Sequence, residues 1–433
     1  MNPLELLKSI ADFTVFDYLR TVWGDAPWVE AVLDTIGIFV VSTFCLLIVI
    51  FLIWLERKVI ARMQDRIGPN RVGGKWGLLQ TVADVLKLLS KETITPAGAD
   101  KWAYNIAPFA IVMAALLVWA VLPFAPNVVG VDLNVGLFYI MAVSSVSVVS
   151  LLLAGWGSNN KYALLGAFRS VAQLVSYEVP MILSVLIPIL LARSMSTVSI
   201  IEAQVVPFIL VVPLSALIFF ISALAETGRT PFDLLEAESE IVAGFHVEYG
   251  GMRFGMFFLA EFISTLFMSG LFATIYLGGW NLPLVNLVIS GLGGVPIDFA
   301  TIPFGRTIAL VIFFIKMFAI YFVFIWIRGT LPRVRIDQML NFNWKFLVPL
   351  TIALIFTVAI LDKVLDSLAA GAVVRAFVHL VSNLLVSWAT LEWLRRRGRQ
   401  NRLAFEAMMA QRRGEPVPVV VEEPVAHDVV HAH

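Results

Sequence analysis

Five carboxylates stand close together in PFDLLEAESEIVAGFHVEY, residues 231–249, within a chain that is otherwise strongly apolar: Asp233, Glu236, Glu238, Glu240 and Glu248. Carboxylates brought together in a medium of low dielectric constant cannot all ionise, so such a group titrates as a coupled cluster. A cluster of this kind can hold protons and pass them on. The sequence therefore raises the possibility of a proton path, which needs elements that bury these acids.

Local sequence predicts that these acids lie on a helix. Thr230 and Pro231 suit the N-cap and N1 positions, and Asp233 takes the place of the usual capping-box Glu. On a helix begun there, Asp233, Glu236 and Glu240 share one face. A helix whose acidic face is in water would show the same spacing. Burial of part of the helix is favoured by its apolar residues, which are Leu234, Leu235, Ile241, Val242 and Phe245.

Four more ionisable side chains lie inside or at the ends of long apolar runs. They are Glu178, Glu226, Glu261 and Lys316. A charged group in a membrane span is costly and by default indicates function. Snorkelling to the interface is the alternative for a lysine, but Lys316 lies near the middle of the run 307–327. We therefore add all four to the predicted proton path.

The composition is that of an integral membrane protein. Hydrophobic residues make up 59% of the chain and charged residues 14%, and the mean hydropathy is +0.88. About 20 helical residues cross a hydrocarbon core of roughly 30 Å. We predict an all-α, polytopic transmembrane helix bundle with about nine spans, near 36–55, 105–125, 136–155, 179–193, 207–225, 255–277, 307–327, 346–362 and 371–391.

The distribution of Lys and Arg predicts the orientation of the bundle, because positive residues in short loops stay cytoplasmic. The loops at 126–135, 194–206 and 278–305 contain no Lys or Arg. We therefore expect the N-terminus outside and the C-terminus inside. The domains predicted on this basis are an amphipathic segment on the outer face (1–35), a bundle (36–394) with cytoplasmic loops (56–104, 156–178, 226–254 and 328–345), and a flexible, polar cytoplasmic tail (395–433).

Residues and motifs that would bind a redox cofactor or a metal ion are scarce. Cys45 is the single cysteine, so disulfides within the chain and cysteine-ligated iron–sulfur clusters are excluded. The histidines show metal-ligand spacing only in HDVVHAH at the end of the chain, which we interpret as a solvated tail. No dinucleotide or P-loop motif is present, and we find no internal repeats of the transporter kind. We predict no metal site and no chemical catalyst in this chain.

The first and fourth cytoplasmic loops combine basic, acidic and aromatic residues. In the first, Asp84 and Lys87 lie three apart on an amphipathic helix expected around 76–90, and Glu92 follows. In the fourth, three arginines lie close to Asp337. Anchoring at lipid headgroups explains the basic residues, but it does not explain why acids are kept among them.

Long segments of the chain resemble the H subunit of NADH-quinone oxidoreductase, respiratory complex I. The resemblance covers roughly residues 50–350, with Gly228 standing where the family commonly has Asn. The segments that carry it are ERKVIARMQDRIGPNRVG, ADVLKLLSKE, SNNKYALLGAFRSVAQLVSYEV, AETGRTPFDLLEAESEIVAGFHVEY, FFLAEF and LPRVRIDQMLNFNWKFLVPL.

The resemblance implies a multi-pass subunit of the proton-pumping complex in the bacterial inner membrane. It would form much of the quinone chamber with the peripheral arm and begin a carboxylate path toward the antiporter-like subunits. Quinone would be the substrate, without a covalently bound cofactor, and FMN and iron–sulfur clusters would be held by partner subunits. Nucleic acid is not an expected partner. An alternative is the equivalent anchor subunit of a membrane-bound hydrogenase-type complex.

These considerations together give two sets of candidate residues. The quinone chamber is predicted to include Arg57, Arg62, Asp84, Glu92, Arg328, Arg333, Arg335 and Asp337. The proton path is predicted to include Glu178, Glu226, Glu236, Glu238, Glu240, Glu261 and Lys316.

Overall fold

The computed structural model of the chain is all-helical in the parts it describes, which are residues 27–233, 244–291, 297–299, 302, 304–369 and 371–413. Eight helices in these parts are long and apolar enough to cross a membrane. The chain forms two compact units, residues 1–380 and 381–433. The first unit holds the bundle, and the second begins within the last helix.

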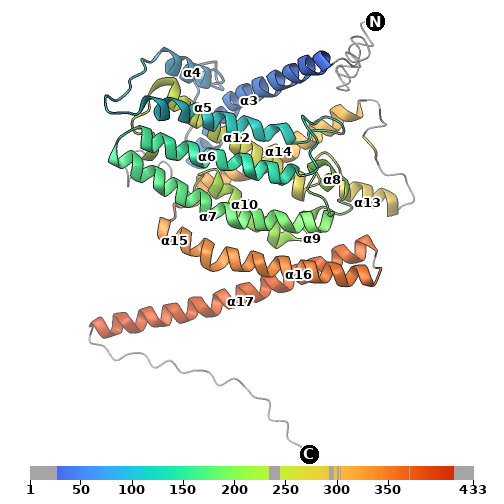
Figure 1. The fold of residues 1–433 in the computed structure, drawn as a ribbon. Helices are drawn as coiled ribbons and strands as arrows, with labels where there is room; N and C mark the ends of the chain where they lie inside the picture. Colours follow the sequence, from blue (N-terminus) through green and yellow to red (C-terminus); the bar gives the residue numbers. More distant parts are fainter. Residues whose placement is uncertain are drawn as a thin grey trace, which may run out of the picture. The chain divides into compact units, whose positions relative to one another are not determined.

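The long helices of the bundle follow the apolar runs of the sequence (Figure 1). They are α3 (Pro27–Met63), α5 (Lys101–Leu117) continued by η1 (Val118–Val121), α6 (Gly136–Gly157), α7 (Lys161–Ala192), α12 (Gly251–Tyr276), α14 (Gly305–Thr330), α16 (Val348–Ser367) and α17 (Ala372–Arg413). The shorter elements are α4 (Gln80–Ser90), α8 (Thr197–Glu202), α9 (Phe208–Val211), α10 (Pro213–Glu226), η2 (Gly244–His246), α13 (Pro283–Gly291), α15 (Ile336–Phe342) and the π-helical turn η3 (Asn343–Leu347).

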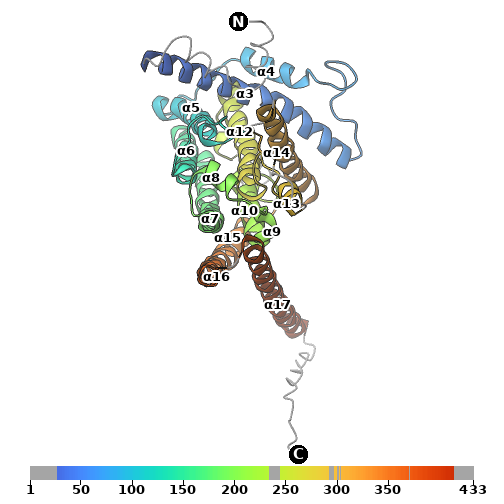
Figure 2. The ribbon, with the colours of Figure 1, turned by 90° about the vertical axis from the view of Figure 1, so that its right-hand side faces the viewer.

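Helix α12 is the centre of the bundle. It packs against α5, α14, α3, α4 and α10, and Figure 2 shows it between α5 and α14. It is also the most buried of the eight long helices. Helices α5, α6 and α7 follow one another as neighbours in sequence order. Any side chain on α12 therefore faces a protein interior that several helices share.

The observed helices confirm the predicted bundle but differ from the predicted spans in several places. Helix α3 begins at Pro27, before the predicted 36–55, and α17 continues to Arg413, into the tail predicted to be flexible. Helix α7 begins at Lys161 and runs unbroken through Pro180 and Pro188, so most of the predicted loop 156–178 is helical. The run 207–225 is instead divided, because α9 ends before Pro213, which begins α10. A proline fits the first turn of a helix, where its missing N–H has no partner to lose. Helix α10 has 14 residues.

Polar contacts fix the ends of α7 and α16 within the first unit. The π-helical turn η3 carries Asn343, which is fully buried and donates to the carbonyl oxygen of Ser176 on α7. At the other end of α16, Asp366 accepts from Arg375 at 2.5 Å and also pairs with Arg193, the residue that ends α7. These contacts hold α16 against α7 at both of its ends.

Candidate functional site

The turn after α10 places a buried arginine at the centre of the bundle. Gly228 has a φ of 64°, and the N–H groups of Gly228 and Arg229 donate to the carbonyl oxygens of Ala225 and Leu224. This is the Schellman arrangement that ends many helices with a left-handed residue. Glycine adopts that conformation without strain, and Asn does so more easily than other residues. The Gln173 side chain on α7 donates to the carbonyl oxygens of Ala225 and Phe232 and so fixes this turn.

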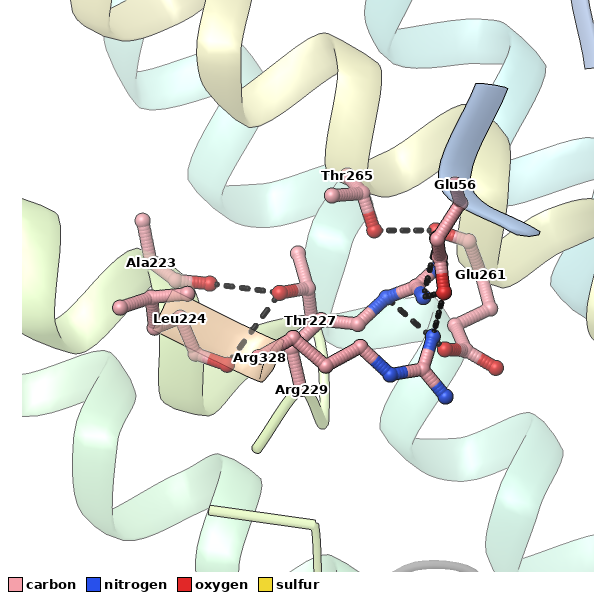
Figure 3. Close-up of polar contacts among 8 residues, drawn as sticks. All are labelled: Glu56, Ala223, Leu224, Thr227, Arg229, Glu261, Thr265 and Arg328. Carbon is pink, nitrogen blue, oxygen red and sulfur yellow. Dashed lines mark hydrogen bonds and ion pairs between the residues drawn. The ribbon is translucent and has the colours of Figure 1, made fainter. Parts of the chain in front are cut away.

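Arg229 belongs to a buried network of two arginines and two glutamates (Figure 3). Its Nη1 donates to both carboxylate oxygens of Glu56 at 2.9 and 2.8 Å, and its Nε lies 3.0 Å from Oε1 of Glu261. Arg328 also pairs with Glu56. The guanidinium of Arg229 lies 4.4 Å from the ring centroid of Phe262. The formal charges cancel within the network, which makes the burial of Glu56 and Arg229 and the partial burial of the other two side chains tolerable.

A cavity of about 640 Å³ opens beside this network. Apolar residues of α3, α4 and α12 form most of its wall, and Glu56, Glu261 and Arg328 contribute polar groups. Arg57, Asp84 and Lys87 also line it. Arg57 Nη1 donates to Asp84 at 2.5 Å, and Lys87 lies 3.8 Å from the same carboxylate. A mostly apolar cavity of this size with a few polar groups is typical of a site for an organic ligand.

A second, smaller cavity of about 80 Å³ lies on the other side of α12. Its polar lining includes Glu226, Glu261, His246, Ser147 and Ser264. The Oε2 atom of Glu226 is buried and has no hydrogen-bond partner among the residues that the structure describes. A cavity with this volume has room for about five water molecules at roughly 15 Å³ each. Water there would supply the partners that Glu226 lacks.

The segment after the acidic stretch is held closely against α5 and α7. The rings of Tyr104 and Tyr249 stack with centroids 4.2 Å apart, and Tyr249 donates to the carbonyl oxygen of Tyr104 at 3.0 Å. Gly166 of α7 touches the backbone of Gly244, where a Cβ atom would come within 2.6 Å. Burial lowers the pKa of the His246 imidazole to about 4, so His246 is neutral at pH 7.

The structure brings only part of the predicted chamber together. Arg57, Asp84 and Arg328 line the larger cavity, whereas Arg333 pairs with Asp233 at 2.9 Å. The remaining four predicted chamber residues are exposed and do not line either cavity; they are Arg62, Glu92, Arg335 and Asp337.

The predicted proton path is partly described. Glu226 and Glu261 line the smaller cavity, and Glu178 lies half-buried on α7. Residues 230–233 form a turn, so the predicted helix does not begin at Thr230, and residues 234–243, over which it would continue, lie outside the described residues. Glu236, Glu238 and Glu240 lie there as well, so their place in the path stays a prediction.

Lys316 makes contacts that favour a structural role. Its ammonium group donates to the carbonyl oxygens of Leu277 and Gly279 at 2.8 Å and of Asn281 at 2.5 Å. These carbonyls belong to the cap and the turn that follow α12, near a helix C-terminus, where a positive charge is favourable. A lysine so engaged neutralises the end of α12, and its predicted place in the proton path remains untested.

Sequence reasoning missed Glu56 and Arg229, the two most deeply buried members of the ion-pair network. Glu56 is 6% exposed and Arg229 3%, and 173 positions separate them. A usable signal existed, because Glu56 directly follows the first apolar run and an acid at that place is costly unless it is paired. The partner could not be identified, since no local periodicity connects residues so far apart.

Metal ligands do not come together in the part of the chain that the structure describes, where no group of three or more His, Cys, Asp and Glu side chains is suited to hold an ion.

Comparison with known proteins gives the family. The family model described as NADH dehydrogenase matches residues 36–359. The chain is 48% identical over 310 residues to the NADH-quinone oxidoreductase H subunit of Dehalococcoides mccartyi (strain CBDB1), covering 72% of this chain and 81% of that protein. It is 49% identical over 306 residues to the corresponding protein of Geobacillus kaustophilus, covering 70% and 86%. The corresponding protein of Bacteroides thetaiotaomicron is 43% identical over 333 residues, covering 76% and 89%.

The sequence left open whether the chain is a subunit of the respiratory complex or the anchor subunit of a hydrogenase-type complex. These matches support the respiratory complex. The eight apolar helices make the chain a multi-pass membrane protein, and the relatives imply that other subunits of the complex are its partners and that quinone is the substrate. The chain belongs to the family of the NADH-quinone oxidoreductase H subunit and is a membrane subunit of that enzyme complex.

Proposed function

We propose that the larger cavity is part of the quinone-binding chamber and that Glu261 begins a proton path leading away from it. The observation that carries this proposal is the cavity itself, which combines a long apolar wall with the carboxylates of Glu56 and Glu261. An isoprenoid tail needs the apolar wall. A quinone headgroup needs hydrogen-bond donors, and Arg57 and Arg328 lie in the lining.

The chemistry requires protons close to the quinone. Quinone takes up protons as well as electrons when it becomes quinol. The electrons would come from FMN and iron–sulfur clusters in partner subunits. Changes in charge or hydration at the headgroup would then alter the proton occupancy of Glu261, which an arginine holds at 3.0 Å.

From Glu261 the path would continue through the smaller cavity to Glu226, and then to Glu178. Glu226 and Glu261 line the same cavity, and Glu178 lies half-buried on α7, which packs against α10. The acids of the stretch 234–243 would belong to the same path, as their spacing suggests. We place this activity in the bacterial inner membrane, with the N-terminus outside and the C-terminus inside.

The rest of the predicted chamber would be completed by partners. Arg62, Glu92, Arg335 and Asp337 are exposed, which suits side chains that a peripheral-arm subunit covers. Their role in the chamber depends on that contact.

Quinone kinetics test the proposal. Asp84→Asn and Arg57→Gln each break the ion pair in the cavity lining, so the KM for quinone should rise or quinone-linked turnover should fall. NADH oxidation with an artificial acceptor that bypasses the chamber should stay normal. Glu202→Gln removes an exposed acid from α8 and serves as the control.

Two results would count against the chamber. One is wild-type quinone kinetics in both cavity variants. The other is a parallel decline of both activities in proportion to the amount of assembled complex, which would make the pair a structural contact.

A further inference from the structure

Helix α12 is the wall between the two cavities. Gly255, Leu259 and Phe262 line the larger cavity, whereas Phe257, Ala260 and Ser264 line the smaller one. Each set follows the three- and four-residue spacing of one helical face. The two faces meet along an edge of the helix.

Two side chains at that edge line both cavities. They are Phe258 and Glu261, which lie three residues apart and therefore stand next to each other on the helix surface. Among the lining residues that the structure describes, Glu261 is the polar group common to both cavities. Phe258 is the other residue that the two linings share, and its aromatic ring lies beside the Glu261 carboxylate on this edge of α12.

Neighbouring rings hold Phe258 in place. Its ring centroid lies 4.7 Å from that of Phe254, which faces the larger cavity. It lies 6.3 Å from the ring of His246, at an interplanar angle of 66°, and His246 faces the smaller cavity. The ring of Phe254 also lies 5.2 Å from that of His246, so the three rings pack together at the boundary.

We propose that Phe258 is a dry partition between the quinone cavity and the smaller cavity, so that protons cross between them on the Glu261 carboxylate. This inference rests on the proposed function, to which it adds a positioning residue. Protons move along chains of water molecules and titratable groups, and an aromatic ring offers neither. A continuous water path past Glu261 would let protons bypass that carboxylate. Quinone reduction would then proceed without an obligatory change in the protonation of Glu261.

Truncating the ring should open such a bypass. Phe258→Ala removes the ring beside a carboxylate, and a roomy site with polar partners admits water. In membrane vesicles containing the assembled complex, we expect NADH-quinone turnover to continue. The number of protons pumped per quinone reduced should fall to about half of the wild-type value or less. Phe258→Leu, which keeps an apolar side chain in place, should retain the wild-type ratio.

The helix supplies its own matched controls. Leu259→Ala enlarges only the larger cavity and Phe257→Ala only the smaller one, so both should keep the wild-type ratio of protons to quinone. The ratio does not depend on how much complex assembles. If Phe258→Ala fails to assemble, Phe258→Val takes its place with the same expectation.

Failure of this inference differs from failure of the proposed function. A wild-type ratio in the Phe258 truncation, or an equal decline in Phe258→Ala, Leu259→Ala and Phe257→Ala, would overturn the partition. Glu261→Gln is measured alongside. Wild-type turnover and pumping in Glu261→Gln would overturn the proton path itself, whereas a loss in Glu261→Gln with normal coupling in Phe258→Ala would remove only the partition.

Discussion

The Nε atom of Arg229 lies 3.0 Å from Oε1 of Glu261. The arginine comes from the turn that precedes the acidic stretch, and the glutamate lines both cavities. A shift of that turn would therefore change the charge felt by Glu261. This pair connects the acidic stretch electrostatically to the proposed quinone site.

Removing Arg229 should destabilise the subunit. Arg229→Gln leaves Glu56 and Glu261 with Arg328 as the remaining cation of the network, and loss of one partner from a buried ion pair costs about 3–5 kcal/mol. We expect a lower temperature for loss of this subunit from the purified complex. The double variant Arg229→Gln with Glu261→Gln should recover part of the loss. Arg396→Gln, at the exposed pair with Glu392, should cost less than about 1 kcal/mol. Equal temperatures for Arg229→Gln and Arg396→Gln would refute the buried network.

Lys316 allows a structural role to be separated from proton transfer. Lys316→Met leaves three carbonyl oxygens without their donor, and a hydrogen bond to a charged group contributes about 1.5–3 kcal/mol. A structural role predicts less assembled complex, with normal turnover and pumping for each complex that does assemble. Normal assembly with slow pumping would instead support a place for Lys316 in the proton path.

The acids of the stretch 234–243 are expected to exchange protons during turnover. Glutamine keeps the size of glutamate but cannot release a proton at neutral pH. Glu236→Gln or Glu240→Gln should leave assembly intact and cut quinone-linked turnover and pumping by about tenfold or more, which requires a barrier increase of about 1.4 kcal/mol. Rates are measured in vesicles and normalised to assembled complex. Wild-type rates in both variants and in the double variant would indicate a solvated acidic face.

The orientation of the bundle can be tested by cysteine labelling. Asn70→Cys should react with a membrane-impermeant reagent from the cytoplasmic side only, because the first basic loop is predicted to lie inside. The native Cys45 is fully buried in α3, so the unmodified chain provides a low background. Labelling of Asn70→Cys from the outer side would reverse the assignment of every loop.

His246 should make stability depend on pH. Burial lowers its pKa from 6.5 to about 4, so between these values the unfolded chain binds more protons than the folded one. The contribution of neutral His246 to the folding stability is fully present above pH 6.5 and is lost as the pH falls toward 4. His246→Asn should flatten the decline in the temperature of subunit loss between pH 7 and 5. Parallel declines in the variant and the wild type would contradict this contribution.

Much of the fold could be predicted because membrane spans are long and their signal is local. Each of the predicted runs has a helical counterpart. The continuity of α7 from Lys161 through its two prolines could not be predicted. Pro180 and Pro188 are ordinarily helix breakers, whereas tertiary packing in a bundle compensates for their missing hydrogen bonds. Pro213, in contrast, does begin a new helix. The residues next to it do not show why this proline starts a helix whereas Pro180 and Pro188 lie inside one.

Part of the site could be predicted, because an ionisable residue within an apolar run of the sequence indicates a functional residue. Glu226 and Glu261 were identified in this way and do line one cavity. Phe258 could not be singled out from the sequence, because an apolar helix contains several phenylalanines and nothing in the residue type sets this one apart. Its importance depends on which two faces of α12 adjoin cavities, and only the packing of α3, α5 and α4 around α12 determines that.

The length of α10 has a consequence for protein design. Its 14 residues extend about 21 Å at roughly 1.5 Å per residue, which is shorter than a hydrocarbon core of roughly 30 Å. Its last residue, Glu226, consequently shares a cavity with Glu261, ten positions inside α12. A carboxylate thus reaches the interior at the end of a truncated helix and not in the middle of a full-length one. Inserting a single turn into α10 would advance Glu226 by roughly 5 Å and separate it from Glu261, and it would also displace the following turn, which carries Arg229.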